Sequence, residues 1–532
     1  MSEWDRIFEE FGKKFLERRA RMEGFDPAKH SFFVHDPETQ FISTLLTGYV
    51  TNFYYMAGEE VFKYGVTLHK SIIDKEPEFH LDAISIARRY GAMKDQVAIG
   101  LLLWSKHPKR KEHFDELVEL LATFPPNYLV KKFINAKRKG KHIFGGLGVF
   151  EKALIREVIN NWNERGLLEY YAAKYRWYMY DIIKLSHAFI PEDIWEYIKK
   201  GTRYSGNSEY LKKVAEIVKE RKFIHTFNKP KFPFELIRAN FDKEEWTSWI
   251  LENTDLTGNT LILQAMSMYE AIPEVVDYIE KAVKSPTVTA DKILKASLVA
   301  LTKYNDLDHE LVQALGKAYA EKVKETYKQL LLPIDKKMKI TVVLDASGSM
   351  LGGTWGCMYI KAISSVAPFS PLVENLILFS EDADHEDPTL LSTLEGLNQL
   401  LDIAYSKYDS GTNIVDGLKL ALETESNVVI LATDEQANII RSNSYYNTEV
   451  ELIKKLINEG KTVIVLNPTP YPVSVTDIKL KDVIYIRAPN PESVIASLKL
   501  EQIRRSEKDA KELVSLLKAK IKAKSKKELE EN

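Results

Sequence analysis

Three oxygen-bearing side chains stand at a spacing that could bind a metal ion. Asp345, Ser347 and Ser349 follow the β-branched apolar run 340–344 at positions i, i+2 and i+4. At the carboxyl end of a buried parallel strand, this spacing directs one carboxylate and two hydroxyl groups into one crevice. Hard divalent cations prefer oxygen ligands, and Mg²⁺ takes few protein ligands while keeping bound water. The pattern therefore indicates a divalent-cation site.

Two residues further along the chain could complete this site. Thr412 follows a Ser-Gly pair, and Asp434 ends a second apolar run at 428–433. If both runs are parallel strands of one sheet, their carboxyl ends meet at the same edge. An ordinary strand-to-helix turn with a helix-capping serine remains an alternative for the Ser-Gly-Ser segment.

The order D-x-S-x-S, then a distant Thr, then a distant Asp resembles the metal-ion-dependent adhesion site of von Willebrand factor A domains. The resemblance implies direct metal contact from Ser347, Ser349 and Thr412, with Asp345 and Asp434 acting largely through bound water. It also implies one open coordination position for an acidic group of a partner. The expected ion is Mg²⁺, with Mn²⁺ as the second candidate.

The composition is that of an ordinary soluble multidomain protein. The 532 residues are 45% hydrophobic and 28% charged, with a net charge of −2. This length favours two or more domains. The single cysteine excludes an intrachain disulfide, and we see neither a signal peptide nor an apolar run near the ~20 residues that cross a bilayer. The expected location is the cytoplasm, without membrane contact.

The pattern of apolar residues changes near residue 335. Before it, apolar residues recur at three- and four-residue spacing, which predicts helices almost throughout. Successive helix pairs suit an α-solenoid of HEAT-like units, with a compact bundle as the alternative. After it, short β-rich runs alternate with helical stretches, which favours a doubly wound, Rossmann-like parallel sheet. We predict a helical domain at 1–335, an α/β domain at 336–500 and a terminal helix or tail at 501–532.

The helical half contains several basic and aromatic clusters. Segment 131–142 is cationic and lacks any acid, and further clusters lie at 106–111 and 174–178. Such charge binds phosphate backbones, and unpaired bases stack on neighbouring aromatic rings. One cluster alone would fit a solvated helix face, but several within about a hundred residues favour nucleic acid.

In combination, these halves resemble the Ro autoantigen family, in which a TROVE module precedes a von Willebrand factor A domain. The motifs are the basic segment 131–142, the run Ala153-Leu154-Ile155-Arg156 with Trp162, and the run 181–187 ending in Leu185-Ser186-His187. The match is to a divergent or prokaryotic-type Ro orthologue. The segment before His187 is shorter than in familiar members and lacks their glycine–tryptophan pair, so RNA specificity can differ.

The resemblance implies a ring of HEAT-like repeats closed by the A domain. Its basic outer surface would bind small structured Y-like RNA, and its central hole would accept single-stranded 3′ ends of misfolded RNA. The implied role is small-RNA stability and RNA quality control, as a monomer, with an exoribonuclease as a further candidate partner. The expected RNA-contacting residues are Lys131, Lys132, Lys137, Arg138, Lys139, Lys141, Arg156, Lys174, Arg176 and His187.

We find no catalytic constellation in the sequence. Asp345-Ala346-Ser347 lacks the second aspartate of a phosphoryl-transfer loop, and no phosphate-binding G-x-x-x-x-G-K-[ST] motif is present. A non-enzymatic binding protein is therefore expected. The alternative function is a metal-dependent protein–protein scaffold that uses the A domain without RNA.

Overall fold

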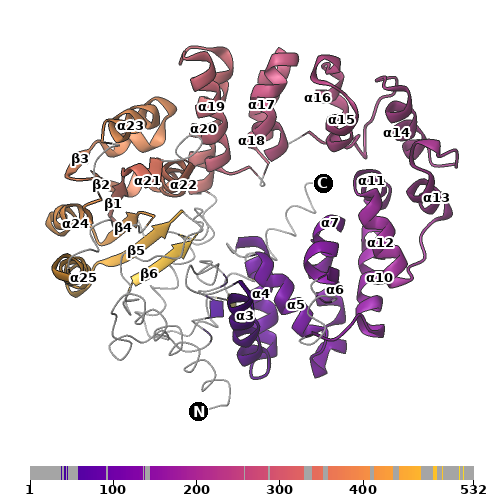
Figure 1. Cartoon of the computed structure of the whole chain (residues 1–532), viewed down its shortest axis with the longest axis horizontal. Coiled ribbons are helices and arrows are strands. Elements are labelled where there is room, and N and C mark those ends of the chain that lie inside the picture. The colour runs from indigo at the N-terminus through magenta and orange to yellow at the C-terminus, as the bar shows by residue number, and fades with distance from the viewer. Residues whose placement is uncertain are drawn as a thin grey trace. The chain divides into compact units, whose positions relative to one another are not determined.

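The computed structural model describes most of the chain, in which a long series of helices precedes an α/β sheet (Figure 1). It describes residues 38, 41–42, 45, 58–90, 94–135, 137, 144–256, 258–285, 288–328, 338–351, 357–407, 412–434, 443–468, 483–487, 494, 514–515 and 519. The chain divides into two compact units, 1–97 together with 289–532, and 98–288. The predicted domain boundaries at 335 and 500 remain predictions.

In the unit at 98–288 the described elements are helices. Its elements are η2 (Pro108–Lys111), α6 (Phe114–Ala122), α7 (Pro126–Tyr128), the π-helical η3 (Leu129–Ile134), α10 (Val149–Glu164), α11 (Leu168–Lys174), α12 (Arg176–Ser186), α13 (Glu192–Lys200), η4 (Gly201–Arg203), α14 (Glu209–Glu220), α15 (Phe234–Asn240), η5 (Lys243–Glu245), α16 (Trp249–Asn253), α17 (Asn259–Ala271), η6 (Pro273–Val275) and α18 (Val276–Val283). α5 (Lys94–Trp104) crosses the boundary between the units.

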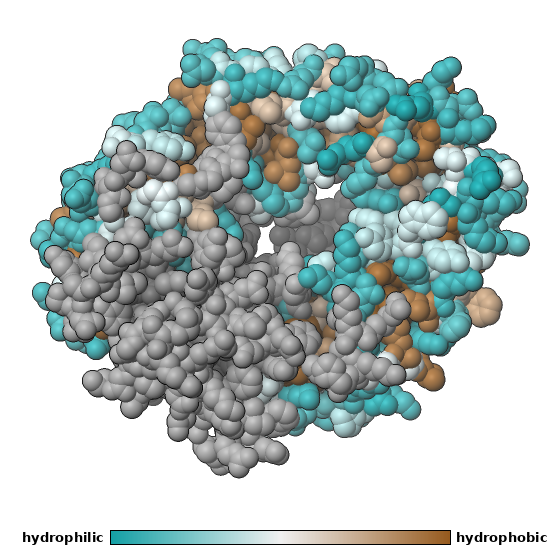
Figure 2. All heavy atoms as spheres, in the orientation of Figure 1, coloured by the Kyte–Doolittle hydropathy of each residue, from teal (hydrophilic) through white to brown (hydrophobic). Residues whose placement is uncertain are grey.

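Helix α10 illustrates how the sequence forms these elements. The carboxylate of Glu151 accepts a hydrogen bond from the backbone N–H of Gly148 at 2.8 Å, which caps the start of the helix. One face of α10 is buried and packs against α6 and α12. Trp162 on this face donates its indole N–H to the carbonyl of Ala122 at 3.1 Å. In Figure 2 the helices of this unit present mainly hydrophilic surface, with hydrophobic side chains gathered between them.

The described part of the other unit contains helices and the sheet. Its elements are α3 (Gly58–Ile73), α4 (Pro77–Tyr90), α19 (Ala290–Tyr304), α20 (Glu310–Lys328), β1 (Ile340–Asp345), α21 (Gly348–Leu351), α22 (Cys357–Val366), η7 (Ala367–Leu372), β2 (Val373–Phe379), β3 (Ala383–Glu386), η8 (Pro388–Ser392), α23 (Leu394–Ser406), α24 (Ile414–Glu423), β4 (Val428–Ala432), α25 (Asn443–Asn458), β5 (Thr462–Asn467) and β6 (Val483–Arg487). Asn305, whose left-handed backbone has φ 49°, ends α19.

The sheet has the strand order β3-β2-β1-β4-β5-β6, and only β3 is antiparallel to its neighbour. Every residue of β1, β4 and β5 is buried, as expected for strands covered on both faces. Helices α24 and α25 lie on one side of the sheet, and α21 and α22 lie on the other (Figure 1). The strand order reverses between β1 and β4, which is where ligands bind in open α/β sheets.

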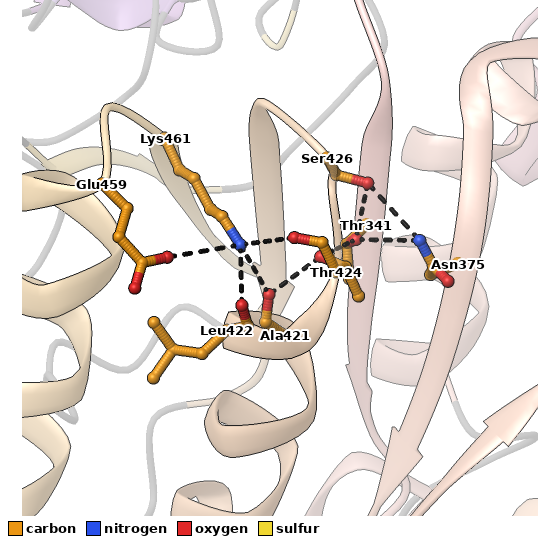
Figure 3. A network of polar contacts seen from close by, with 8 residues as sticks. All are labelled: Thr341, Asn375, Ala421, Leu422, Thr424, Ser426, Glu459 and Lys461. Carbon is orange, nitrogen blue, oxygen red and sulfur yellow. Dashed lines mark hydrogen bonds and ion pairs between the residues drawn. The ribbon is translucent and has the colours of Figure 1, made fainter.

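A polar network closes the opposite edge of the sheet, where the strands begin (Figure 3). Buried Lys461 donates to the carbonyls of Ala421 (3.0 Å), Leu422 (3.2 Å) and Thr424 (2.7 Å), which lie where α24 ends. Thr341 of β1 donates to the hydroxyl of Ser426 at 2.8 Å. These groups satisfy one another, so this edge is structural.

No helix in the described part of the chain is both long and apolar enough to cross a membrane.

Candidate functional site

The five predicted metal-binding residues lie at the carboxyl ends of the strands or in the loops that follow them. Asp345 is the last residue of β1, and Asp434 follows β4 by two residues. Ser347 and Ser349 lie at the start of α21, and Thr412 precedes α24. Four of them are at most 2% exposed: Asp345, Ser347, Thr412 and Asp434.

Hydrogen bonds fix the geometry around Asp345. One carboxylate oxygen accepts from the backbone N–H of Ser347 at 2.8 Å, and the other accepts from the hydroxyl of Thr433 at 2.6 Å. The hydroxyl oxygens of Ser347 and Ser349 lie 3.1 Å apart. The predicted Asp345, Ser347 and Ser349 constellation is thus assembled at one strand end.

Two buried carboxylates, those of Asp345 and Asp434, repel each other at this site. Burial is the main cause that raises the pKa of Asp345 to about 6, and the negative charge of Asp434 adds to it. The hydrogen bonds from Ser347 and Thr433 act in the opposite direction but do not outweigh these effects. A bound cation would remove the repulsion between the carboxylates.

A buried hydroxyl without a partner adds a second indication. The Oγ1 atom of Thr412 has no hydrogen-bond partner within the described part of the chain, and the same holds for the Oγ of Ser380. The two residues are linked because the N–H of Asn413 donates to the carbonyl of Ser380 at 2.5 Å. Buried polar atoms are normally paired, so these hydroxyls are suited to a ligand or to ordered water.

The donor set fits a hard divalent cation. It consists of carboxylate and hydroxyl oxygens, as Mg²⁺ requires, and includes no sulfur or imidazole. Among the described residues no group of three or more His, Cys, Asp or Glu could hold a metal ion, so hydroxyl oxygens would have to complete the coordination here. Sequence reasoning also missed Thr433 and Ser380. Ser380 directly follows buried β2, so the rule that found Asp345 could have found it.

In the helical unit, four predicted RNA-contacting residues gather around α12. Arg176 is its first residue, and His187 ends it with a left-handed backbone (φ 56°). Lys131 of η3 places its ammonium 5.6 Å from the centre of the Tyr178 ring. Arg156 of α10 donates to the carbonyl of Ser186 at 3.4 Å. These predicted residues from separate segments therefore lie beside one helix.

Arg176 is held firmly at the junction of α12 and α13. Its Nε and Nη2 donate to the carbonyls of Ile198 and Lys199, each at 2.8 Å. Gly201, at φ 58°, makes room for the guanidinium, because a Cβ there would lie 2.5 Å from its Nη1. Arg176 therefore caps α13 and presents its charge in a fixed place.

Lys174 and Lys132 contribute less free charge than predicted. The Lys174 side chain is 12% exposed, and its ammonium pairs with Asp255 at 2.6 Å and Glu235 at 3.0 Å. These carboxylates neutralise it and tie α11 to the region of α15 and α16. Lys132 is half-buried, with its ammonium 5.9 Å from the centre of the Tyr128 ring.

The prediction for Lys137 as a surface RNA contact is wrong. Lys137 is completely buried, and its ammonium lies 2.5 Å from Glu151 and 2.5 Å from the hydroxyl of Ser105. Burial opposes ionisation of Glu151, but the hydrogen bond and charge of Lys137, together with a backbone hydrogen bond of Glu151 itself, outweigh it and lower the pKa of this carboxyl to about 2. The pair joins segment 131–137 to α10, so Lys137 is structural. Arg138, Lys139 and Lys141 lie outside the described residues.

Comparison with known proteins reveals similarity at the level of structure. No protein-family model matches the chain, and no curated protein matches it in sequence. The crystal structure of the Ro (RSR) protein of Deinococcus radiodurans is similar, with a TM-score of 0.54 and 14% sequence identity. The match covers 88% of this chain and all of that one. The chain thus has the fold of a Ro protein.

Proposed function

We propose that this protein binds RNA as a Ro-type protein, through the surface around α12. The observation that carries this proposal is the gathering of Lys131, Arg156, Arg176 and His187 around one helix, α12, although they come from separate segments. Cations grouped in this way neutralise phosphates, and their aromatic neighbours can stack on unpaired bases. The fold similarity to the Ro protein supports the same function.

The finer features of this proposal follow the Ro resemblance. The helical part would be a TROVE module of HEAT-like repeats that forms a ring with the α/β part, a von Willebrand factor A domain. The outer surface would bind small structured Y-like RNA, and the central hole would take the single-stranded 3′ ends of misfolded RNA. The protein would act without catalysis in small-RNA stability and RNA quality control, as a cytoplasmic monomer with an exoribonuclease as a candidate partner.

We further propose that the α/β part holds Mg²⁺, with Mn²⁺ as a possible substitute, in an adhesion-type site. Ser347, Ser349 and Thr412 would be direct ligands, while Asp345 and Asp434 would act mainly through water. The buried carboxylate pair and the unpaired Thr412 hydroxyl support this assignment. When bound, the ion would offer an open position to an acidic group of a partner protein.

Filter binding across a salt series tests RNA binding. The logarithm of the affinity should fall linearly with the logarithm of the salt concentration, by about 0.7–0.9 for each phosphate neutralised. Replacing Lys131 and exposed Lys184 with Gln should weaken binding and reduce this slope. The matched control replaces Lys219 and Lys284, which are exposed on other helices, and should leave both unchanged. A weak, salt-independent interaction of the unaltered protein would refute the proposal.

A further inference from the structure

The outward ridge of α12 carries an exposed tryptophan. Trp177, Asp181 and Lys184 are all exposed, and their spacing of four and three residues aligns them on the side opposite the buried Met179 and Ile182. Trp177 is 68% exposed, whereas Trp104 and Trp162 are completely buried in the core. An exposed indole offers a large, rigid ring face on which a ligand can stack.

Trp177 is supported from one side by a positive charge. The guanidinium of Arg176 lies 4.6 Å from the centre of the Trp177 ring, and its own hydrogen bonds to α13 hold it there. A cation at this distance is attracted to the ring and restricts its motion. The remaining surface of the indole is open to solvent, so it forms a prepared stacking surface.

A second aromatic pair lies beside this ridge. The rings of Tyr180 on α12 and Trp195 on α13 are stacked, with centres 5.6 Å apart and planes 9° from parallel. Lys184 lies 5.7 Å from each ring centre, and Lys199 lies 5.6 Å from that of Trp195. The carbonyl of Lys199 accepts from Arg176, which connects the pair to Trp177. We call these six residues the α12–α13 platform: Arg176, Trp177, Tyr180, Lys184, Trp195 and Lys199.

The charges around the platform favour an anionic partner. Three of its six residues are cations, and Glu196, beside Trp195 in the sequence, is paired with Lys200 at 2.5 Å. Asp181 is the acid on the ridge itself. Trp177 and Lys184 are two helical turns apart, about 10 Å along the axis. Aromatic rings alternating with cations over this length match the bases and phosphates of one nucleic-acid strand.

We propose that the α12–α13 platform binds unpaired RNA nucleotides by stacking a base on Trp177. This inference rests on the proposed RNA-binding function and specifies the form of RNA that this surface takes. In a duplex the base faces are covered by their neighbours, so only an unpaired or terminal base can reach the indole. Lys184 and Lys199 bind the adjoining phosphates. The platform therefore selects single-stranded segments over blunt duplexes.

The experiment compares a short single-stranded RNA with the corresponding blunt duplex. Trp177→Ala should weaken binding of the single strand about 5- to 150-fold, the range for loss of one stacked base, without changing the salt slope. Trp177→Phe should retain most of the affinity, because a ring remains. Duplex affinity should change little in either variant. As the matched control, Tyr405→Ala removes an aromatic residue that is 47% exposed on α23, and it should have no effect.

Photo-crosslinking then locates the contact. A single-stranded RNA that carries 5-iodouridine should crosslink to the peptide containing Trp177, and Asp181→Asn should strengthen binding by removing a negative charge from the ridge. If Trp177→Ala binds the single strand as well as the unaltered protein does, with salt-dependent binding intact, the platform is refuted and RNA binding stands elsewhere. If the unaltered protein binds no RNA, the proposed function fails as well. If Trp177→Ala no longer binds a protein that the unaltered chain binds, but keeps its RNA affinity, the platform is a protein-docking surface and the inference is refuted.

Discussion

Replacing Asp345 with Asn should stabilise the metal-free protein at neutral pH and abolish its stabilisation by Mg²⁺. Burial and Asp434 raise the pKa of Asp345 from 3.8 to about 6. Because the folded-state pKa is raised, the associated stability is present below about pH 4 and is lost as pH rises through about 6. A shift of about two pKa units corresponds to roughly 3 kcal/mol. Asn carries no charge and avoids this cost.

Scanning calorimetry in the presence of a chelator measures this effect. At about pH 7.5 the Asp345→Asn transition should lie roughly 6–12 °C above that of the unaltered protein, and the difference should disappear near pH 4. Saturating Mg²⁺ should raise the transition of the unaltered protein at about pH 7.5, but not that of the variant. Asp402→Asn, which removes an exposed carboxylate on α23, is the control and should follow the unaltered protein throughout.

Two outcomes would contradict this reasoning. If metal-free Asp345→Asn is no more stable than the unaltered protein at neutral pH, the two carboxylates do not repel each other at a buried site. If Mg²⁺ raises both transitions equally, the ion binds somewhere else.

Two further buried charges give predictions that unfolding experiments can check. Lys137→Met leaves the buried Glu151 carboxylate without its closest partner and should lower the free energy of unfolding by about 3–5 kcal/mol, measured by urea denaturation. Lys132→Met, at a half-buried position, should cost far less, and equal losses would show that the buried pair is unimportant. Burial raises the pKa of Glu449 on α25 to about 7, so Glu449→Gln should stabilise the protein above pH 7 and have little effect near pH 4. A gain that is independent of pH would refute this assignment.

The metal-site geometry could be predicted because it depends on local spacing and strand ends. Asp345, Ser347 and Ser349 adjoin one strand, and the parallel-sheet rule places Asp434 at the same edge. The apolar runs at 340–344 and 428–433 likewise predict strands, and the structure confirms them as β1 and β4.

Other features depend on long-range contacts that the sequence does not reveal. β3 consists of Ala-Asp-His-Glu and pairs only at the sheet edge, so no apolar run marks it. Lys137 looks like its basic neighbours, but the turn of the helix directs it inward to Glu151. Tyr180 and Trp195 lie on different helices, and only the packing of α12 against α13 makes them a stacked pair.

Hydrogen exchange with and without single-stranded RNA most directly tests the central claim, that RNA binds around α12. The account predicts slower amide exchange in the peptides of α12 and α13 when RNA is bound, with little change in α17 and α18. Protection confined to other helices, or no protection at RNA concentrations that saturate binding, would contradict it.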